Sequence, residues 1–264
     1  MLNYETLDLE IDESNNFAII FLNRPQQFNA FNIKLIEELI SAFTEISNDK
    51  RIRCLVISGR GKAFCSGGDV GEFKRAERPD VFMSQIVELL HKGLKLLKEM
   101  KIITIAAING PCFGAGLGYA TACDFRVSSE KATFGCAFTK IGLSPDSSST
   151  FHIPKLVGLS LANEMLFLNR ILTAEEALKY GLINKIINMG SFMEEVKKFA
   201  IIVARGAPLA FAYTKNLINQ SFTNDLETHL NREAENIVKT AGTEDFQEGL
   251  KAFFEKREPD FKGK

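Results

Sequence analysis

Short apolar runs closed by turn residues alternate with amphipathic stretches along the first half of the chain. Runs of this length, followed by glycine, asparagine or proline, predict buried strands. Apolar residues spaced by three and four positions predict the helices between them, and Asn32 is a suitable N-cap for the first helix. We expect strands over 17–22, 54–58, 102–108 and 124–128, and helices over 32–47, 81–100 and 117–123.

This alternation predicts an α/β fold with a largely parallel sheet. After Leu159 the strand pattern weakens, and 183–187 is the best remaining candidate. Thr173-Ala-Glu-Glu-Ala177 opens a helix with a capping pattern, and two or three more helices are expected before Phe254. We therefore expect an α/β core over residues 1–200 and a helical region over 201–264.

The composition is that of a globular protein, with 45% hydrophobic and 25% charged residues in 264 positions. The 32 basic residues nearly cancel the 33 acidic ones, and a net charge of −1 argues against nucleic-acid or membrane binding. No run reaches the roughly 18 apolar residues of a membrane span. The first ten residues lack the apolar segment of a secretion signal, so we expect a cytoplasmic protein.

The cysteines and histidines do not form a recognisable site. An odd number of cysteines without a Cys-x-x-Cys pair is typical of reduced thiols, not of disulfides or a zinc site. These cysteines are Cys54, Cys65, Cys112, Cys123 and Cys136. No metal site is expected. The three histidines have no evident nucleophile partner and are interpreted as structural residues, namely His91, His152 and His229.

Two glycine clusters carry the candidate chemistry. The first, Gly114-Ala-Gly116-Leu-Gly118, follows a predicted strand and opens a predicted helix. It lacks the later glycine of a dinucleotide-binding motif, since Tyr119 and Thr121 occupy those positions. A helix N-terminus with so few side chains can bind an anion or a developing oxyanion through free N–H groups. Close helix packing is the alternative explanation.

The second cluster, Ala63-Phe-Cys-Ser-Gly-Gly-Asp69, follows the strand that ends at Ser58. Its glycines permit a turn that exposes backbone N–H groups, although a plain turn with Asp69 capping the next helix is also compatible with the pattern. Two N–H donors from two such turns would form an oxyanion hole. This arrangement suits a thioester whose carbonyl becomes an enolate.

Several motifs together resemble the crotonase superfamily, the enoyl-CoA hydratase/isomerase family. They follow the order of that family over about residues 15–260. They are Asn23-Arg-Pro25 with Asn29-Ala30, the 63–69 cluster, Asn109-Gly-Pro-Cys-Phe-Gly-Ala-Gly116, Cys123-Asp124, the segment 174–183, and Phe253-Phe-Glu-Lys-Arg257.

The resemblance implies a crotonase-like spiral of ββα units with a helical C-terminal trimerisation region. It implies acyl-CoA thioester substrates, with coenzyme A as part of the substrate and no separate cofactor, and a homotrimer or a dimer of trimers. It places the oxyanion donors at the backbone N–H groups of Ser66 and Ala115. It also implies that a further set of residues holds the substrate: Arg24, Ala63, Phe64, Gly67, Gly68, Asp69, Val70, Gly114, Phe253 and Lys256, the last reaching a neighbouring subunit's coenzyme A.

The acid and base residues distinguish the reactions of this family. Its hydratases use two glutamates, whose positions correspond here to Gly118 and Phe138. Neither residue can carry a proton, so ordinary hydratase activity is not expected.

A carboxylate follows in Gly142-Leu-Ser-Pro-Asp146. This segment resembles the corresponding loop of two isomerase branches, the peroxisomal-type Δ3,Δ2-enoyl-CoA isomerases and the ring-epoxide isomerases of phenylacetyl-CoA breakdown. One carboxylate is sufficient to move a proton from C2 to C4 of a 3-enoyl thioester. The structural alternative is that Asp146 caps the helix that follows.

We therefore predict an isomerase that converts a 3-enoyl-CoA into a 2-enoyl-CoA, with Asp146 as the proton shuttle. The alternatives are a ring-epoxide isomerase of phenylacetyl-CoA catabolism, a hydratase-like enzyme, and a non-catalytic acyl-CoA-binding subunit. Segment 71–85 reads as a polar, mobile loop that covers the acyl site.

Overall fold

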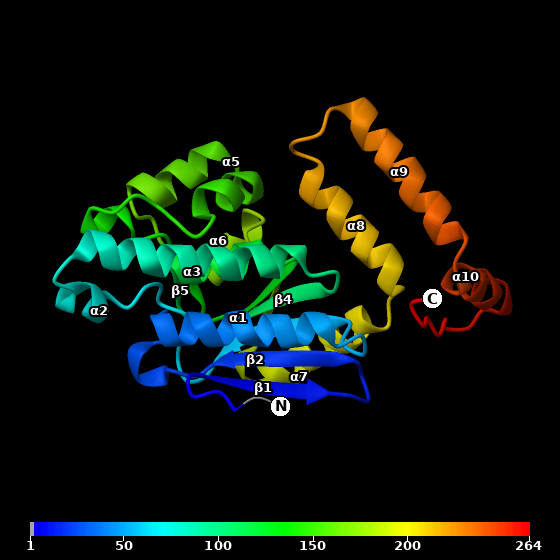
Figure 1. The fold of residues 1–264 in the computed structure, drawn as a ribbon, viewed down its shortest axis with the longest axis horizontal. Coiled ribbons are helices and arrows are strands. Elements are labelled where there is room, and N and C mark those ends of the chain that lie inside the picture. The colour runs from blue at the N-terminus through cyan, green and yellow to red at the C-terminus, as the bar shows by residue number, and fades with distance from the viewer. Residues whose placement is uncertain (1–2) are drawn as a thin grey trace.

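Two β-sheets form the frame of the protein, whose computed structural model describes residues 3–264 (Figure 1). The larger sheet has the order β1-β2-β3-β4-β6-β9, and all of its neighbouring strands are parallel except β1 and β2. Its strands are β1 (Leu7–Asp12), β2 (Phe17–Leu22), β3 (Cys54–Gly59), β4 (Ile103–Ile108), β6 (Phe125–Ser129) and β9 (Lys185–Ile187). The smaller sheet contains β5 (Cys112–Phe113), β7 (Thr133–Gly135) and β8 (Leu172–Thr173).

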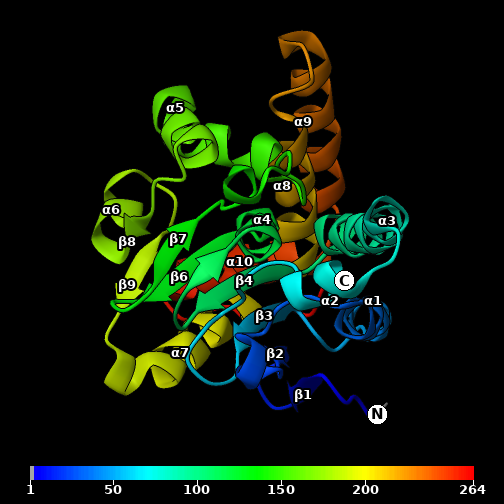
Figure 2. The ribbon, with the colours of Figure 1, turned by 90° about the vertical axis from the view of Figure 1, so that its left-hand side faces the viewer.

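Helices cover both faces of the larger sheet (Figure 2). On one face, Ala18 and Ile20 of β2 belong to a core that includes α1 (Ile33–Asn48) and α3 (Pro79–Glu99). On the other face, Phe17 and Ile19 pack in a second core with α7 (Phe192–Ala204). Strand β2 is therefore buried on both sides, which explains its continuous apolar sequence.

Four more helices lie between residues 70 and 179. They are α2 (Val70–Arg75), α4 (Ala115–Ala122), α5 (Ser149–Phe167) and α6 (Ala174–Lys179). Short 3-10 turns occupy Pro25–Gln27, Thr139–Ile141 and Met189–Ser191. Within residues 3–264, no helix is both long enough and apolar enough to cross a bilayer.

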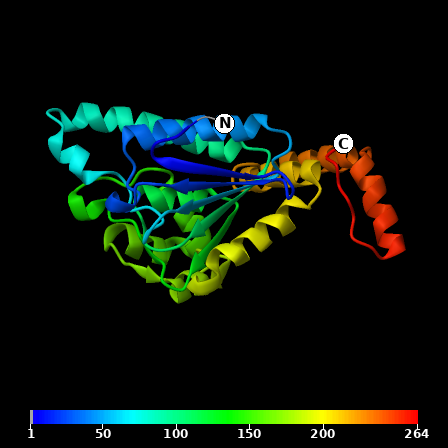
Figure 3. The ribbon, with the colours of Figure 1, turned by 90° about the horizontal axis from the view of Figure 1, so that it is seen from below.

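The last three helices extend away from the sheets (Figures 1 and 3). They are α8 (Pro208–Gln220), α9 (Leu226–Ala241) and α10 (Glu244–Glu255). Helix α8 is anchored by buried Lys215, whose Nζ donates to Asp124 Oδ2 at 2.7 Å and to the Ile102 carbonyl at 2.9 Å. Helix α9 buries none of its residues.

The predicted alternation of strands and helices is confirmed, and so are two caps. The Asn32 side chain accepts from Leu35 N, and Thr173 forms a full capping box with Glu176. The helix expected from residue 117 already begins at Ala115. Strand β1 and the three short strands of the smaller sheet were not predicted from the sequence.

The prediction of a mobile polar loop over 71–85 is wrong. This segment contains α2 and the beginning of α3. The Asp69 carboxylate accepts hydrogen bonds from the N–H groups of Gly71 and Glu72, which starts α2. Pro79 at the first turn of α3 needs no hydrogen-bond acceptor for its nitrogen and has a backbone angle suited to that position.

Candidate active site

The two glycine clusters meet at the point where the smaller sheet begins. Phe113 N donates to the Cys65 carbonyl at 2.9 Å, and Cys65 and Cys112 form a parallel bridge between the two turns. A methyl group added to Gly67, which has φ +99°, would lie 3.2 Å from the Phe113 carbonyl oxygen and 3.5 Å from Ala115 N. The two turns therefore pack backbone against backbone, as the oxyanion-hole hypothesis requires.

The hydrogen bonds in these turns do not support the expected donor at Ser66. Its N–H donates to the Phe28 carbonyl at 3.0 Å and is used within the chain. Around the next glycine, Phe31 N donates to the Gly67 carbonyl and Asp69 N donates to the Phe31 carbonyl. These bonds leave the Gly68 N–H without an acceptor among residues 3–264.

The second donor lies at the start of α4. Ala115 is the first residue of this helix, so the helix itself offers its N–H no acceptor. Gly114 precedes it with φ +53° and ψ −128°, a conformation that favours glycine. The N–H groups of Gly68 and Ala115 are thus both without an acceptor among the described residues, as is the N–H group of Gly67. The first of them had been assigned from the sequence only to substrate binding.

The expected coenzyme-A-binding residues near this junction have structural partners. Arg24 Nη2 lies 2.9 Å from Asp69 Oδ2, and its Nη1 donates to the Ala30 carbonyl at 2.5 Å. Asp69 in turn caps α2, so the capping alternative for this residue is confirmed. The side chains of Ala63 and Phe64 are buried in the core. Only Val70, which is 56% exposed, presents its side chain to a ligand from outside.

Asp146 makes contacts that a capping residue would not make. Its Oδ1 lies 2.7 Å from His91 Nε2, and its Oδ2 accepts from Ser147 Oγ at 3.2 Å. The N-cap of α5 is Ser148, and no side chain caps that helix. The side chain of Asp146 remains 26% exposed. The Asp146 carboxylate is therefore fixed by its contact with His91 of α3, and the capping alternative for Asp146 is not supported.

His91, which was interpreted from the sequence as a structural residue without a nucleophile partner, contacts the Asp146 carboxylate. His91 lies on α3, 55 positions before Asp146, and its imidazole is about half exposed. No motif in the sequence links the two residues.

The backbone next to Asp146 packs against Gly118, one of the two positions that correspond to the glutamates of hydratases. A methyl group added to Gly118 would lie 2.0 Å from the Ser147 carbonyl oxygen, so no larger residue fits there without a shift of this loop. Ser147 and Ser148 both have positive φ, at 53° and 62°, and Ser147 is fully buried. The other hydratase position is Phe138, whose ring tip would be 3.9 Å from a methyl group on Gly114.

Two cysteines beside the junction are not nucleophiles. Cys65 is completely buried, and burial raises the pKa of its thiol to about 12. Burial also raises the pKa of the Cys112 thiol well above its ordinary value. Because the thiolate is the reactive form, both thiols remain inert at neutral pH.

Phe253 and Lys256 lie apart from this junction. Phe253 belongs to α10 and Lys256 follows it, at the end of the molecule opposite α2 and α5 (Figure 1). The structure therefore does not bring them to the site of their own chain.

Comparisons with known proteins agree with the fold. Residues 12–264 match the model of the enoyl-CoA hydratase/isomerase family. The chain is 31% identical to a crotonyl-CoA hydratase of Syntrophomonas wolfei, with 98% of each chain covered. It is 32% identical to a trans-2-decenoyl-[acyl-carrier-protein] isomerase of Streptococcus mutans, with 95% of this chain and 96% of that protein covered.

A crystal structure of an enoyl-CoA hydratase from Bacillus anthracis superimposes with a TM-score of 0.94 at 30% identity. The match covers 98% of this chain and all of that one. The crotonase-like fold is thereby confirmed. Hydratase names predominate among the similar proteins, so the printed names do not decide between hydration and isomerisation.

Proposed function

Because the chain belongs to the enoyl-CoA hydratase/isomerase family, we propose that it is an acyl-CoA isomerase that converts a 3-enoyl-CoA into a 2-enoyl-CoA. The observation that supports this reaction is that the site has one carboxylate, Asp146, and no space for a second acid at Gly118. Asp146 extends toward α3, while the Ser147 carbonyl fills the space beside Gly118 where a second acid would stand.

In this proposal, the N–H groups of Gly68 and Ala115 bind the thioester oxygen. They replace the pair Ser66 and Ala115 expected from the sequence, because the Ser66 N–H is already bonded to Phe28. Each donor of such a hole contributes about 2.7–4 kcal/mol to the transition state. The hole stabilises the dienolate that forms when C2 loses a proton.

Asp146 carries the proton in this reaction. Its carboxylate takes a proton from C2 and returns the same proton to C4, so no second acid is needed. His91 is a positioning residue, because its ring nitrogen lies 2.7 Å from Oδ1, while Oδ2 accepts one hydrogen bond from Ser147 Oγ and keeps a lone pair for the proton. Acid/base help of this kind contributes roughly 10²–10⁴-fold to the rate.

Water addition lacks the groups that it requires. A hydratase must orient a water molecule and deliver a proton to the α-carbon. At the two positions that correspond to the hydratase glutamates, this chain has Gly118, which packs against the Ser147 carbonyl, and Phe138.

The remaining substrate contacts are proposals as well. The turn at Gly67–Val70 would lie against the thioester arm. Phe253 and Lys256 can contribute only to the site of a neighbouring chain, in a homotrimer or a dimer of trimers, because α10 is remote from its own site.

The proposal is tested with 3-hexenoyl-CoA, whose conversion into 2-hexenoyl-CoA is followed for wild type and Asp146→Asn. The amide keeps the shape of the carboxyl but cannot carry the proton, so we expect kcat to fall by roughly 10²-fold or more. The matched control is Glu88→Gln, an exposed carboxyl on the same helix as His91, which should leave kcat unchanged.

Two variants at position 91 test the positioning role. His91→Ala should lower kcat about ten-fold with little change in KM, and His91→Gln should recover part of the loss because its amide can donate to Oδ1. Full activity of Asp146→Asn would contradict the proposal. Thioester binding without turnover in wild type would favour a non-catalytic acyl-CoA-binding subunit, and turnover only of ring epoxides would favour the phenylacetyl-CoA alternative.

A further inference from the structure

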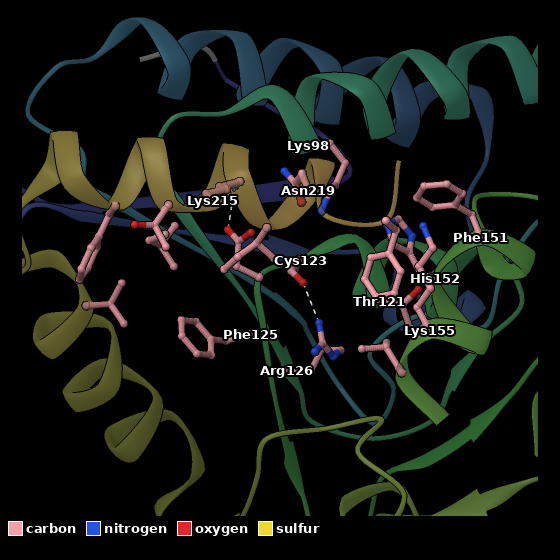
Figure 4. A pocket seen from close by; sticks show the side chains of 18 of the residues that line it. Lys98, Thr121, Cys123, Phe125, Arg126, Phe151, His152, Lys155, Lys215 and Asn219 are labelled. Carbon is pink, nitrogen blue, oxygen red and sulfur yellow. Dashed lines mark hydrogen bonds and ion pairs between the residues drawn. The ribbon is translucent and has the colours of Figure 1, made fainter. Parts of the chain in front are cut away.

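A cavity of about 620 Å³ lies between α8, the first turns of α5, and the ends of α3 and α4 (Figure 4). None of the residues proposed above for catalysis or thioester binding lines it. Thr121 and Cys123 border the cavity at the C-terminal end of α4, whereas Ala115 begins that helix. At 1.5 Å per residue, the two sites are separated by about 10 Å along the helix.

The cavity wall carries more positive than negative charge. Four cationic side chains line it, and Asp124 is its single carboxylate. Asp124 is already bonded to Lys215 at 2.7 Å. The other three cations have no carboxylate partner within residues 3–264, and they are Lys98, Arg126 and Lys155.

Arg126 is the most informative of these cations because it is only 7% exposed. Its Nε donates to the Leu182 carbonyl at 2.8 Å, and its Nη1 donates to the Cys123 carbonyl at 2.7 Å. Nη2 makes no hydrogen bond among the described residues, and it is not enclosed by protein atoms, so it is accessible from the cavity. Burying a guanidinium without an anion is costly, and an anion in the cavity would compensate for that cost.

His152 responds to the same positive charge. Burial, together with the nearby charges of Lys98, Lys155 and Arg126, lowers the pKa of its imidazole to about 4. The ring is therefore neutral at pH 7, so it adds no charge to the wall. Figure 4 shows Lys98 at the top of the view, Arg126 below it and His152 to the right.

The rest of the cavity is apolar. Phe125 and Phe199 pack edge to face with their ring centroids 5.3 Å apart. The remaining apolar wall comes mainly from α7, α8 and the turn after α8, through Ile202, Phe211, Ile218 and Phe222. A cavity of this volume with a few convergent polar groups has the usual form of a small-molecule site.

We propose that this cavity binds an unbranched aliphatic carboxylate, with its carboxylate between Lys98 and Arg126 and its chain against the phenylalanines. The charge complementarity selects an anion, and the aromatic wall selects a hydrocarbon chain. This ligand site goes beyond the isomerase reaction and does not depend on it.

Calorimetric titration with sodium decanoate tests the site, with 1-decanol and decyltrimethylammonium as neutral and cationic probes of the same chain length. Decanoate should bind at least about ten-fold more tightly than either, because only the carboxylate gains charge-assisted hydrogen bonds. Lys98→Gln should weaken decanoate binding about ten-fold. Lys101→Gln is the matched control, since this exposed lysine makes no ion pair within residues 3–264 and does not line the cavity.

Asp146→Asn should bind decanoate as wild type does, which separates this site from the isomerase site. Equal affinity for decanoate and decanol, or an unchanged affinity in Lys98→Gln, would overturn the proposal. So would loss of decanoate binding when hexanoyl-CoA saturates the protein. If decanoate does not bind and Phe222→Asp converts an oligomer into monomers, the cavity is instead an interface between copies of the chain.

Discussion

At the residue scale, burial of one histidine makes the stability of the protein depend on pH. The pKa of His152 lies near 4 in the folded protein, below its ordinary value of 6.5. Between these values the unfolded chain binds a proton that the folded chain does not, so stability is lost as pH falls from 6.5 to 4. A pKa lowered from 6.5 to about 4 corresponds to a loss of up to about 3 kcal/mol in unfolding free energy.

His152→Gln removes this titration. Chemical denaturation at pH 7 and pH 4.5 should therefore show a smaller loss of unfolding free energy in the variant than in wild type. His91→Gln provides a control at an exposed imidazole. Equal losses in wild type and His152→Gln would show that this histidine does not contribute.

Residues differ in how far the sequence could predict them. Asp146 and Ala115 were both named because their segments resemble those of the crotonase superfamily. His91 was missed because its contact with Asp146 spans 55 positions and depends on how α3 packs. The proposed donor at Gly68 became visible only through the hydrogen bonds that already occupy the N–H groups of Ser66 and Asp69.

At the element scale, the packing of α4 against the loop that carries Asp146 controls the site. Gly118→Ala would place a methyl group 2.0 Å from the Ser147 carbonyl oxygen. Because both groups are backbone-fixed, the loop must move, and we expect a loss of about 1–3 kcal/mol in unfolding free energy together with reduced isomerase activity.

Gly242→Ala is the matched control for this substitution. Position 242 has a negative φ, and its nearest atom would be 3.6 Å from the new methyl group, so the change should be nearly neutral. Thermal unfolding and the 3-hexenoyl-CoA assay measure both effects. A Gly118→Ala variant as stable and active as wild type would contradict the role assigned to this contact.

Elements with long, regular apolar patterns were predictable, and those without were not. The buried strands β2, β3 and β4 have continuous apolar sequences, and each was expected. Strand β1 alternates apolar and acidic residues at the edge of the sheet, and β5 and β8 have two residues each. Such short pairings depend on tertiary contacts that leave almost no local pattern.

At the scale of the whole molecule, the C-terminal helices expose more apolar surface than a monomer normally does. Four large apolar side chains of α9 are more than half exposed, namely Leu226, Leu230, Ile237 and Val238. We therefore expect the chain to self-associate through this region. Three copies of 29.4 kDa give a mass of about 88 kDa, the value expected for the trimer.

Sedimentation velocity measures this mass directly. Ile237→Asp should reduce it by placing a charge in the contact, whereas Glu235→Gln, on an exposed position of the same helix, should not. A wild-type chain that remains a 29 kDa monomer at micromolar concentration would contradict the expectation.

The most direct test of the isomerase account is an analysis of products rather than of a single rate. Wild-type protein is given 3-hexenoyl-CoA and 2-hexenoyl-CoA in separate reactions, and the thioesters are identified by mass spectrometry. If the protein is an isomerase, the two enoyl-CoAs interconvert without uptake of water, because Asp146 is the only acid proposed at the reacting carbons. Accumulation of a 3-hydroxyhexanoyl-CoA, 18 Da heavier than either substrate, would contradict it.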